Sequence, residues 1–150
     1  MRTVSRREAL IRATGAAMAL LAGTRLSRAT PADTAAEIAK FTGGKPADKG
    51  MITIDIPEIA ENGNTVPIAI SVESPMTAEN HVSELVVLAD GNPRPGVASF
   101  HFTPLSGRAE AATRIRLAGT QNVIVVAKTS DGRLFTSQRQ VKVTVGGRGG

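Results

Sequence analysis

Short runs in which apolar and polar residues alternate dominate the chain from residue 51 onward. Alternation with a period of two indicates strands that bury one face, and turn residues such as Asn62-Gly63-Asn64 and Asp131-Gly132 separate the runs. Seven strands are predicted in this way: Met51–Ile56, Val66–Val72, Glu84–Ala89, Val97–Thr103, Glu110–Leu117, Asn122–Lys128 and Leu134–Val145.

One short helix is predicted ahead of the strands, over Asp33–Thr42, with Ile38 and Phe41 on one face and Gly43-Gly44 and Pro46 ending it. The length of 150 residues allows one domain. Seven short strands without a long helical pattern favour an all-β fold, a two-layer antiparallel β-sandwich in which each sheet buries one face against the other. A closed barrel is the alternative architecture.

The first thirty residues have the composition of an export signal. Arg6 and Arg7 precede an apolar stretch, residues 13–23, that is too short to span a membrane, which takes about 20 apolar residues. A basic segment, a short apolar segment and small residues make a signal peptide, and the paired arginines indicate the twin-arginine route. We therefore expect a periplasmic protein that is free of the membrane after cleavage. The expected organisation is a signal peptide (1–30), a helical preface and linker (31–50), the sandwich (51–145) and a C-terminal arm (146–150).

The excess of positive charge belongs to this N-terminal segment. Residues 1–30 contain six arginines and one glutamate, whereas residues 31–150 contain 12 basic and 12 acidic residues and are neutral. A neutral body does not steer a polyanion, and four phenylalanines without tryptophan or tyrosine are a poor set for base stacking. We expect no binding of nucleic acid.

Few residues of the body have the type or spacing of a catalytic or metal site. His81 and His101 stand apart from each other and from carboxylate clusters, so each is expected to be solvated or hydrogen-bonded. Arg108, Arg114 and Arg116 are candidates for a basic patch, with an outward polar face as the alternative. The chain has no cysteine, which excludes a disulfide, a zinc–thiolate site and a thiol nucleophile. We expect no active site, metal or cofactor in the body.

The C-terminus departs from the pattern of the body. Gly146, Gly147, Gly149 and Gly150 flank the single side chain of Arg148 directly after the last strand. Glycine adds backbone freedom without bulk, so these residues are predicted to form a flexible arm that threads a narrow channel. Five residues span at most about 17 Å. A frayed tail is the alternative.

Several long blocks of the sequence resemble the SoxY family, the sulfur-carrier subunits of the periplasmic thiosulfate-oxidising Sox system. The blocks are residues 57–67, 74–76, 100–109, 113–118 and 143–150, the last with a Gly-Gly-x-Gly-Gly tail. The resemblance covers the whole chain, signal included. It implies an immunoglobulin-like sandwich, in agreement with the strand pattern.

The resemblance also implies partners and a mechanism. A SoxY protein forms a heterodimer with SoxZ, which lacks a signal and is exported with it, and we expect self-association when a SoxZ-like subunit is absent. The one cysteine of a Gly-Gly-Cys-Gly-Gly tail holds the intermediates covalently. SoxAX joins thiosulfate to it oxidatively, SoxB hydrolyses the terminal sulfone and SoxCD oxidises the remaining sulfane sulfur, with the arm entering each partner in turn.

Arg148 occupies the position of the family's cysteine. A guanidinium remains a cation and forms no disulfide-type bond, so the tail as written carries no sulfur. Three explanations are open: a mutation or sequence error, since a single base separates Cys from Arg codons, a deliberately altered chain, or a natural paralogue. The sequence thus indicates a periplasmic SoxY-type carrier that lacks its attachment residue, or alternatively a non-carrying SoxY-like subunit that pairs with a SoxZ-like protein.

Overall fold

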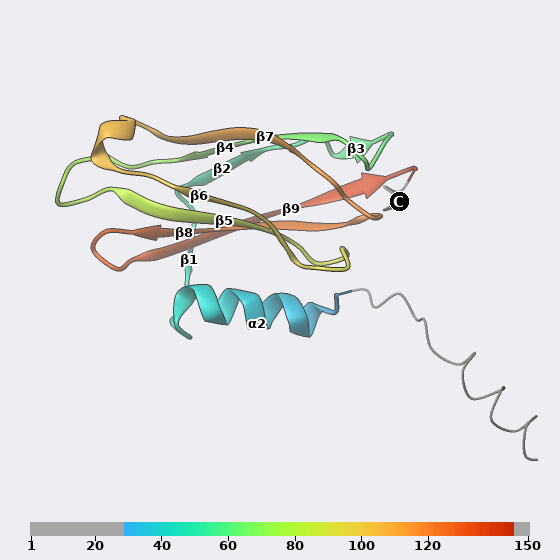
Figure 1. The fold of residues 1–150 in the computed structure, drawn as a ribbon, viewed down its shortest axis with the longest axis horizontal. Helices are drawn as coiled ribbons and strands as arrows, with labels where there is room; N and C mark the ends of the chain where they lie inside the picture. Colours follow the sequence, from blue (N-terminus) through green and yellow to red (C-terminus); the bar gives the residue numbers. More distant parts are fainter. Residues whose placement is uncertain (1–28, 146–150) are drawn as a thin grey trace, which may run out of the picture.

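The strands of the chain pack as two layers, with one helix outside them (Figure 1). The computed structural model describes residues 29–145. The helix α2 spans Pro31–Thr42, and a 3-10 turn, η1, spans Pro104–Ser106. The strands are β1 (Asp48–Lys49), β2 (Ile52–Asp55), β3 (Ile59–Ala60), β4 (Val66–Val72), β5 (Val82–Ala89), β6 (Gly96–His101), β7 (Ala109–Ile115), β8 (Gln121–Thr129) and β9 (Leu134–Val143). All seven predicted strands and the predicted helix are therefore confirmed.

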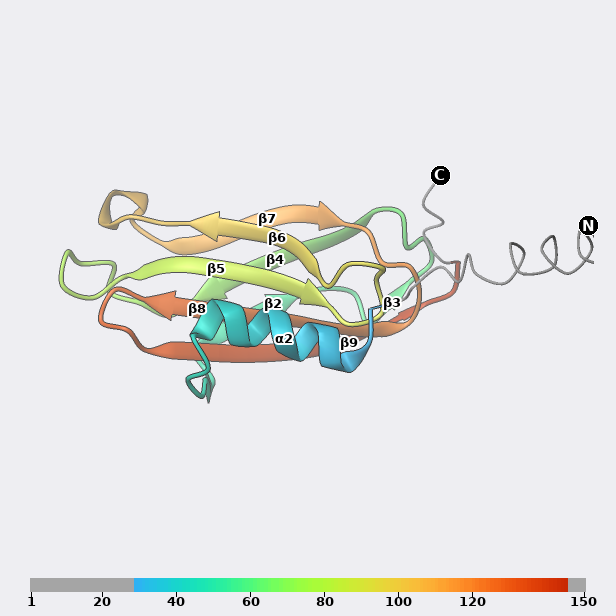
Figure 2. The same cartoon turned by 60° about the horizontal axis from the view of Figure 1, so that its bottom comes forward.

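The larger sheet has the order β1-β9-β8-β5-β6, with β3 also paired to β9, and the smaller sheet has the order β2-β4-β7. Among themselves, the seven predicted strands pair only in antiparallel fashion. The helix α2 lies on the outer face of the larger sheet (Figure 2). The predicted immunoglobulin-like sandwich is confirmed, and the chain does not form the alternative closed barrel.

The two strands that the sequence pattern does not predict are β1 and β3, of two residues each, and both run parallel to β9. Asp48 pairs with Phe135, and Ile59 pairs with Lys142. Two residues are too few for an alternating pattern, which explains why the sequence does not reveal them. Together they lie along the outer edge of β9.

Alternate residues of the central strands build the core between the sheets. Every second residue of β4, from Val66 to Val72, is at most 5% exposed. In β8 the inward-facing residues Val123, Val125 and Ala127 are fully buried. Each buried valine or isoleucine contributes about 1.5–3 kcal/mol relative to an exposed one, so the burial of alternate residues fixes which face of each strand points inward.

The start and the end of α2 follow from local chemistry. The Thr30 hydroxyl accepts a hydrogen bond from the Asp33 amide, and the Asp33 carboxylate accepts one of 2.7 Å from the Thr30 amide. This capping box, with Pro31 in the first turn, starts the helix two residues earlier than predicted. Hydrogen bonds from the Thr30 amide and hydroxyl also hold the pKa of Asp33 below its ordinary value. Gly43 ends the helix in the left-handed conformation (φ 66°). No helix in the described part is long and apolar enough to cross a membrane.

Candidate functional site

The predicted arm and the predicted export signal fall outside the described residues. This holds for the position Arg148, for the paired arginines Arg6 and Arg7, and for the four glycines of the tail, Gly146, Gly147, Gly149 and Gly150. The structure does describe the residues that precede the arm. They are Val143–Val145, termed here the arm root, at the end of the sandwich where β9 lies beside β3 (Figure 1).

The loop after β3 holds the last two residues of the arm root by hydrogen bonds. The Gly63 amide donates to the Val145 carbonyl oxygen at 2.8 Å, and the Thr144 amide donates to the Ala60 carbonyl oxygen at 3.0 Å. The Thr144 hydroxyl adds a longer bond, 3.3 Å, to the Glu61 carbonyl oxygen. The chain is therefore attached to the sandwich up to Val145, beyond the end of β9.

A second loop holds the first residue of the arm root. The Thr120 hydroxyl accepts a hydrogen bond of 3.0 Å from the Val143 amide and lies 3.5 Å from the Val143 carbonyl oxygen, to which it donates. Thr120 comes directly before β8, the strand that pairs with β9. A side chain thus continues the pairing of the two strands at the point where the backbone ladder ends.

The loop that receives Val145 is itself ordered by local bonds. The Asn62 side-chain oxygen accepts a hydrogen bond of 2.9 Å from the Asn64 amide, an arrangement that closes a tight turn around Gly63. The Gly63 carbonyl oxygen accepts a bond of 2.8 Å from the amide of Leu117, whose side chain is fully buried. The arm root is therefore connected through Gly63 to the core.

A surface hollow of about 530 Å³ lies beside the arm root. It is lined by Glu58, Ile59, Thr120, Arg139, Gln140 and Lys142. Ile59 is 59% exposed and Val145 is 63% exposed, so apolar surface is available here. The lining residues of this hollow include no thiol and no imidazole.

Both histidine rings lie against oxygen atoms of the protein, His81 in a hydrogen bond and His101 in a contact with a carboxylate. The His101 Nε2 lies 3.3 Å from the Glu84 carboxylate, which the Lys128 ammonium approaches to 3.8 Å. The His81 Nδ1 lies 3.0 Å from the Thr77 carbonyl oxygen. Among residues 29–145, no group of three or more His, Cys, Asp or Glu side chains is placed to hold a metal ion.

The three arginines considered as a basic patch are exposed but not gathered in one place. Arg108 precedes β7 and lies 3.7 Å from Glu110, whereas Arg116 follows the end of β7. A strand of this length spans about 20 Å and separates the two. Arg114 and Arg116 are both exposed and alternate with the buried Ile115 and Leu117, so the structure separates Arg108 from this pair and favours the alternative of an outward polar face.

The model of the family described as sulfur oxidation protein SoxY matches residues 38–147. The chain belongs to the SoxY family. The match ends at Gly147, directly before Arg148. A solved structure of the sulfur carrier protein SoxY from Chlorobium limicola f thiosulfatophilum is similar, with 32% identity and a TM-score of 0.65 over 77% of this chain and 100% of that chain. No curated protein matches the chain.

Superoxide reductases share the fold of this SoxY-family chain. The T24K form of the enzyme from Ignicoccus hospitalis (neelaredoxin) is 17% identical, with a TM-score of 0.57 over 76% of this chain and 92% of that chain. A superoxide reductase-like protein from Thermotoga maritima is 20% identical, with a TM-score of 0.52 over 69% and 89% of the two chains. At these identities the likeness concerns the fold alone.

The residues that form the attachment of the arm are not apparent from the sequence. Asn62-Gly63-Asn64 has the composition of a turn, but nothing in the pattern links it to Val145. Thr120 is a single threonine between two strands, and no motif marks it. Only the observed parallel pairing of β3 with β9 brings the loop after β3 to the arm root.

Proposed function

We propose that this protein is a SoxY-type subunit of a periplasmic sulfur-oxidation system and that it presents its C-terminal arm to partner enzymes. The SoxY-family match over residues 38–147 carries the proposal. The sulfur carrier role of the Chlorobium protein supports it, as does the attachment of Val145 to the sandwich. The three residues that follow Val145 can span at most about 11 Å, at roughly 3.3–3.6 Å per residue.

Covalent carriage of sulfur needs a thiolate on the arm. Joining thiosulfate to a cysteine forms an S–S bond, releases the thiol proton and passes an electron pair to an oxidising partner of the SoxAX kind. Arg148 has no sulfur atom, and the sulfurs of Met51 and Met76 are thioethers without a proton to lose. The chain as written therefore takes no sulfur adduct in this proposal.

The second candidate function is that of a non-carrying SoxY-like subunit that keeps the sandwich and pairs with a SoxZ-like protein. Arg148 in a chain without cysteine is the observation that favours it. The two candidates differ in what a single substitution achieves. If only the attachment atom is missing, Arg148→Cys creates a working carrier, whereas a chain specialised for another role stays inactive.

In both candidates the protein has no active site of its own. The SoxY-family match and the similarity to the sulfur carrier protein SoxY from Chlorobium support this part of the proposal. The partners are a SoxZ-like subunit in a heterodimer and, transiently, enzymes of the SoxAX, SoxB and SoxCD kinds.

Reconstitution with these partners tests the proposal. Thiosulfate-dependent reduction of a cytochrome acceptor is measured for the SoxZ-paired chain, for Arg148→Cys and for Arg148→Ser, a small residue without a thiol. We expect electron transfer with Arg148→Cys alone. Activity of the unsubstituted chain would contradict the chemistry, and an inactive Arg148→Cys protein would establish the non-carrying role.

A further inference from the structure

In the described part of the chain, most outer edges of the two sheets carry a feature that prevents pairing with another strand. The outer edge of β9 is covered by β1 and β3. The edge strand β2 has four residues, ends at Asp55 and is followed by Pro57. The edge strand β7 bears the exposed charges Glu110 and Arg114. Covering segments, short length, proline and charge are devices that protect sheet edges.

The remaining edge, β6, lacks these devices. Its six residues, Gly96–His101, include no lysine, arginine, aspartate, glutamate or proline. The His101 ring at its end lies against Glu84 of the neighbouring β5. Within the described residues β6 pairs with β5 alone, so one side of its backbone faces no strand.

The hydrogen bonds between β5 and β6 show which backbone N–H and C=O groups of β6 have no partner in β5. The Phe102 amide donates to the Ser83 carbonyl oxygen at 3.0 Å, in register with the pairing of Glu84 and His101. Alternate residues of an antiparallel strand bond to the same neighbour, so the N–H and C=O groups of Ser99 and His101 point away from β5. Such a row of backbone groups is complementary to another β-strand.

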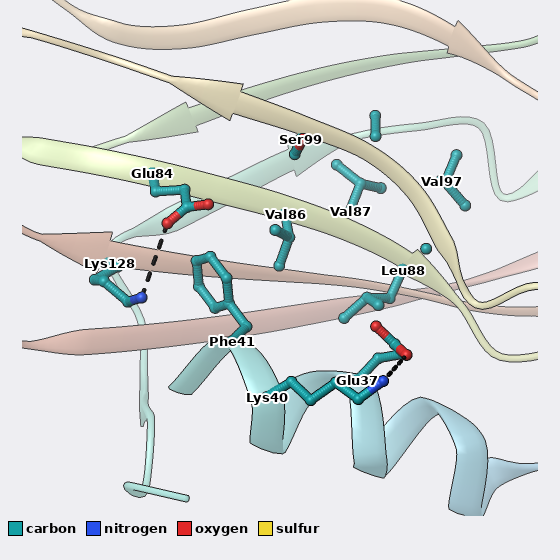
Figure 3. Close-up of a pocket in the computed structure, with 12 residues that line it drawn as sticks. Glu37, Lys40, Phe41, Glu84, Val86, Val87, Leu88, Val97, Ser99 and Lys128 are labelled. Atoms are coloured by element: carbon teal, nitrogen blue, oxygen red, sulfur yellow. Dashed lines mark hydrogen bonds and ion pairs between the residues drawn. The ribbon is translucent and has the colours of Figure 1, made fainter. Parts of the chain in front are cut away.

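A groove of about 570 Å³ runs beside this edge on the outer face of the sheet (Figure 3). Val86 and Leu88 of β5 lie between α2 on one side and Val97 and Ser99 of β6 on the other. The charges at the groove are paired with one another: Lys40 with Glu37 at 2.9 Å and Lys128 with Glu84 at 3.8 Å. An incoming segment therefore meets apolar surface and balanced charge, which suits an uncharged strand.

The turn that follows β6 carries an exposed apolar side chain. Leu105 of η1 is 98% exposed. The turn is held by a hydrogen bond of 3.1 Å from the Thr103 amide to the Ser106 hydroxyl oxygen and by one of 2.9 Å from the Ser106 amide to the Thr103 carbonyl oxygen. A leucine fixed in solvent at the end of a free edge offers an anchor for a partner's apolar pocket.

We propose that the partner subunit adds a β-strand to the free edge of β6 and covers Leu105, so that the larger sheet continues into the partner. The occupant is an uncharged, partly apolar strand of the SoxZ-like subunit, and the inference rests on the heterodimer of the proposed function. The backbone groups of β6 that point away from β5 are complementary to a strand, and the paired charges of the groove favour a strand without charge. A second copy of this chain is the rival occupant.

Proline substitution at matched edge positions tests the inference. Ser99→Pro removes an N–H that points away from β5, so it leaves the pairing within the sandwich intact. The control is Ala112→Pro. The Glu73 amide donates to the Met51 carbonyl oxygen at 2.8 Å, so odd-numbered residues along β4 direct their backbone groups toward β2 and even-numbered residues direct theirs toward β7. The residue of β4 opposite Ala112 is odd-numbered and does not bond to β7. The N–H of Ala112 therefore points to the free edge of β7.

Binding to the purified SoxZ-like subunit is measured by calorimetry. We expect Ser99→Pro to weaken it by about tenfold or more and Ala112→Pro to leave it within about twofold. Leu105→Ser changes a side chain that the fold does not bury, and it tests the same surface if Ser99→Pro does not fold. It is expected to weaken binding by about fivefold or more, with an unchanged thermal unfolding midpoint.

The outcomes separate this inference from the proposed function. If the unsubstituted chain does not bind the SoxZ-like subunit, the heterodimer and this surface are both wrong. If it binds and Ser99→Pro and Leu105→Ser bind equally well, the surface alone is wrong. Loss of self-association with unchanged binding of the SoxZ-like subunit assigns the edge to a second copy and overturns the inference.

Discussion

The Gly63 amide donates a hydrogen bond of 2.8 Å to the carbonyl oxygen of Val145. The carbonyl oxygen of the same glycine accepts a bond from Leu117, which is fully buried. One residue thus connects the core with the last residue that the structure describes before the tail. The proposed carrier arm would deliver its end to a defined place only if its attachment is fixed, and the proposal assigns part of that fixation to this contact.

The hydroxyl of Thr120 is predicted to stabilise the arm root. Thr120→Val keeps the shape of the side chain and removes both bonds to Val143. We expect the free energy of unfolding to fall by about 0.5–1.5 kcal/mol and the amide of Val143 to exchange faster with solvent. Chemical denaturation and hydrogen exchange measure the two effects.

Thr53→Val is the matched control for this substitution. Thr53 lies on the outer face of β2, and the described residues offer its hydroxyl no hydrogen bond. We expect its unfolding free energy to change by less than about 0.5 kcal/mol. Equal exchange rates at Val143 in Thr120→Val and Thr53→Val would show that Thr120 does not hold the arm root.

Gly91 is predicted to tolerate no side chain. A Cβ atom at this position would lie 2.9 Å from the Cβ of Gln121, a buried residue whose side-chain oxygen accepts a bond of 2.7 Å from the Gly91 amide. Gly91→Ala should lower the unfolding free energy by about 1–3 kcal/mol, because the added methyl group displaces the side-chain amide of Gln121 from its hydrogen bonds.

Gly96→Ala is the control, since a Cβ atom there meets nothing within 4 Å. We expect its unfolding free energy to stay within about 0.5 kcal/mol of the unsubstituted chain. Equal stability of the two alanine variants in urea would refute the packing argument at Gly91.

Acid is predicted to weaken the hairpin between β8 and β9. The Thr129 hydroxyl donates to the Asp131 carboxylate, and this bond, helped by Arg133, holds the pKa of Asp131 below its ordinary value of 3.8. A lowered pKa in the folded state contributes stability above about pH 4 that is lost as the pH falls through the folded value. Asp131→Asn should therefore be less stable than the unsubstituted chain near pH 6, and the difference should shrink by about pH 2.5. A difference that is constant with pH in urea unfolding would contradict this.

Export is predicted to depend on the paired arginines. Replacing Arg6 and Arg7 by lysine keeps the charge and removes the pair that indicates the twin-arginine route. We expect the unprocessed precursor to accumulate in the cytoplasm, as detected by fractionation and immunoblotting. Normal processing of the double variant would instead indicate the general secretory route.

The sequence predicts the strands well because alternation is a local property. Ile68 and Ile70 in β4 or Val123 and Val125 in β8 alternate with less buried residues, and burial follows the pattern. The order of the strands is not local. Nothing in the composition of Gly96–His101 shows that β6 lies at an edge, and the two-residue strands β1 and β3 are too short to produce a pattern.

The candidate site likewise contains residues that the sequence reveals and residues that only the structure reveals. The glycines of the tail and Arg148 are recognised from the sequence alone, through the resemblance to SoxY proteins. The residues that hold the arm root, Thr120 and Gly63, belong to loops distant in the sequence from Val143 and Val145. Their role depends on tertiary contacts, so only the structure reveals it.

Mass spectrometry of the C-terminal peptide, after incubation with thiosulfate and the Sox partner enzymes, tests the central claim most directly. The account predicts no adduct on the chain with Arg148 and, on the Arg148→Cys variant, a gain equal to the mass of S₂O₃ that a reductant reverses. An adduct on the unsubstituted peptide, or an unmodified Arg148→Cys peptide, would contradict the claim that the carrier lacks only its attachment atom.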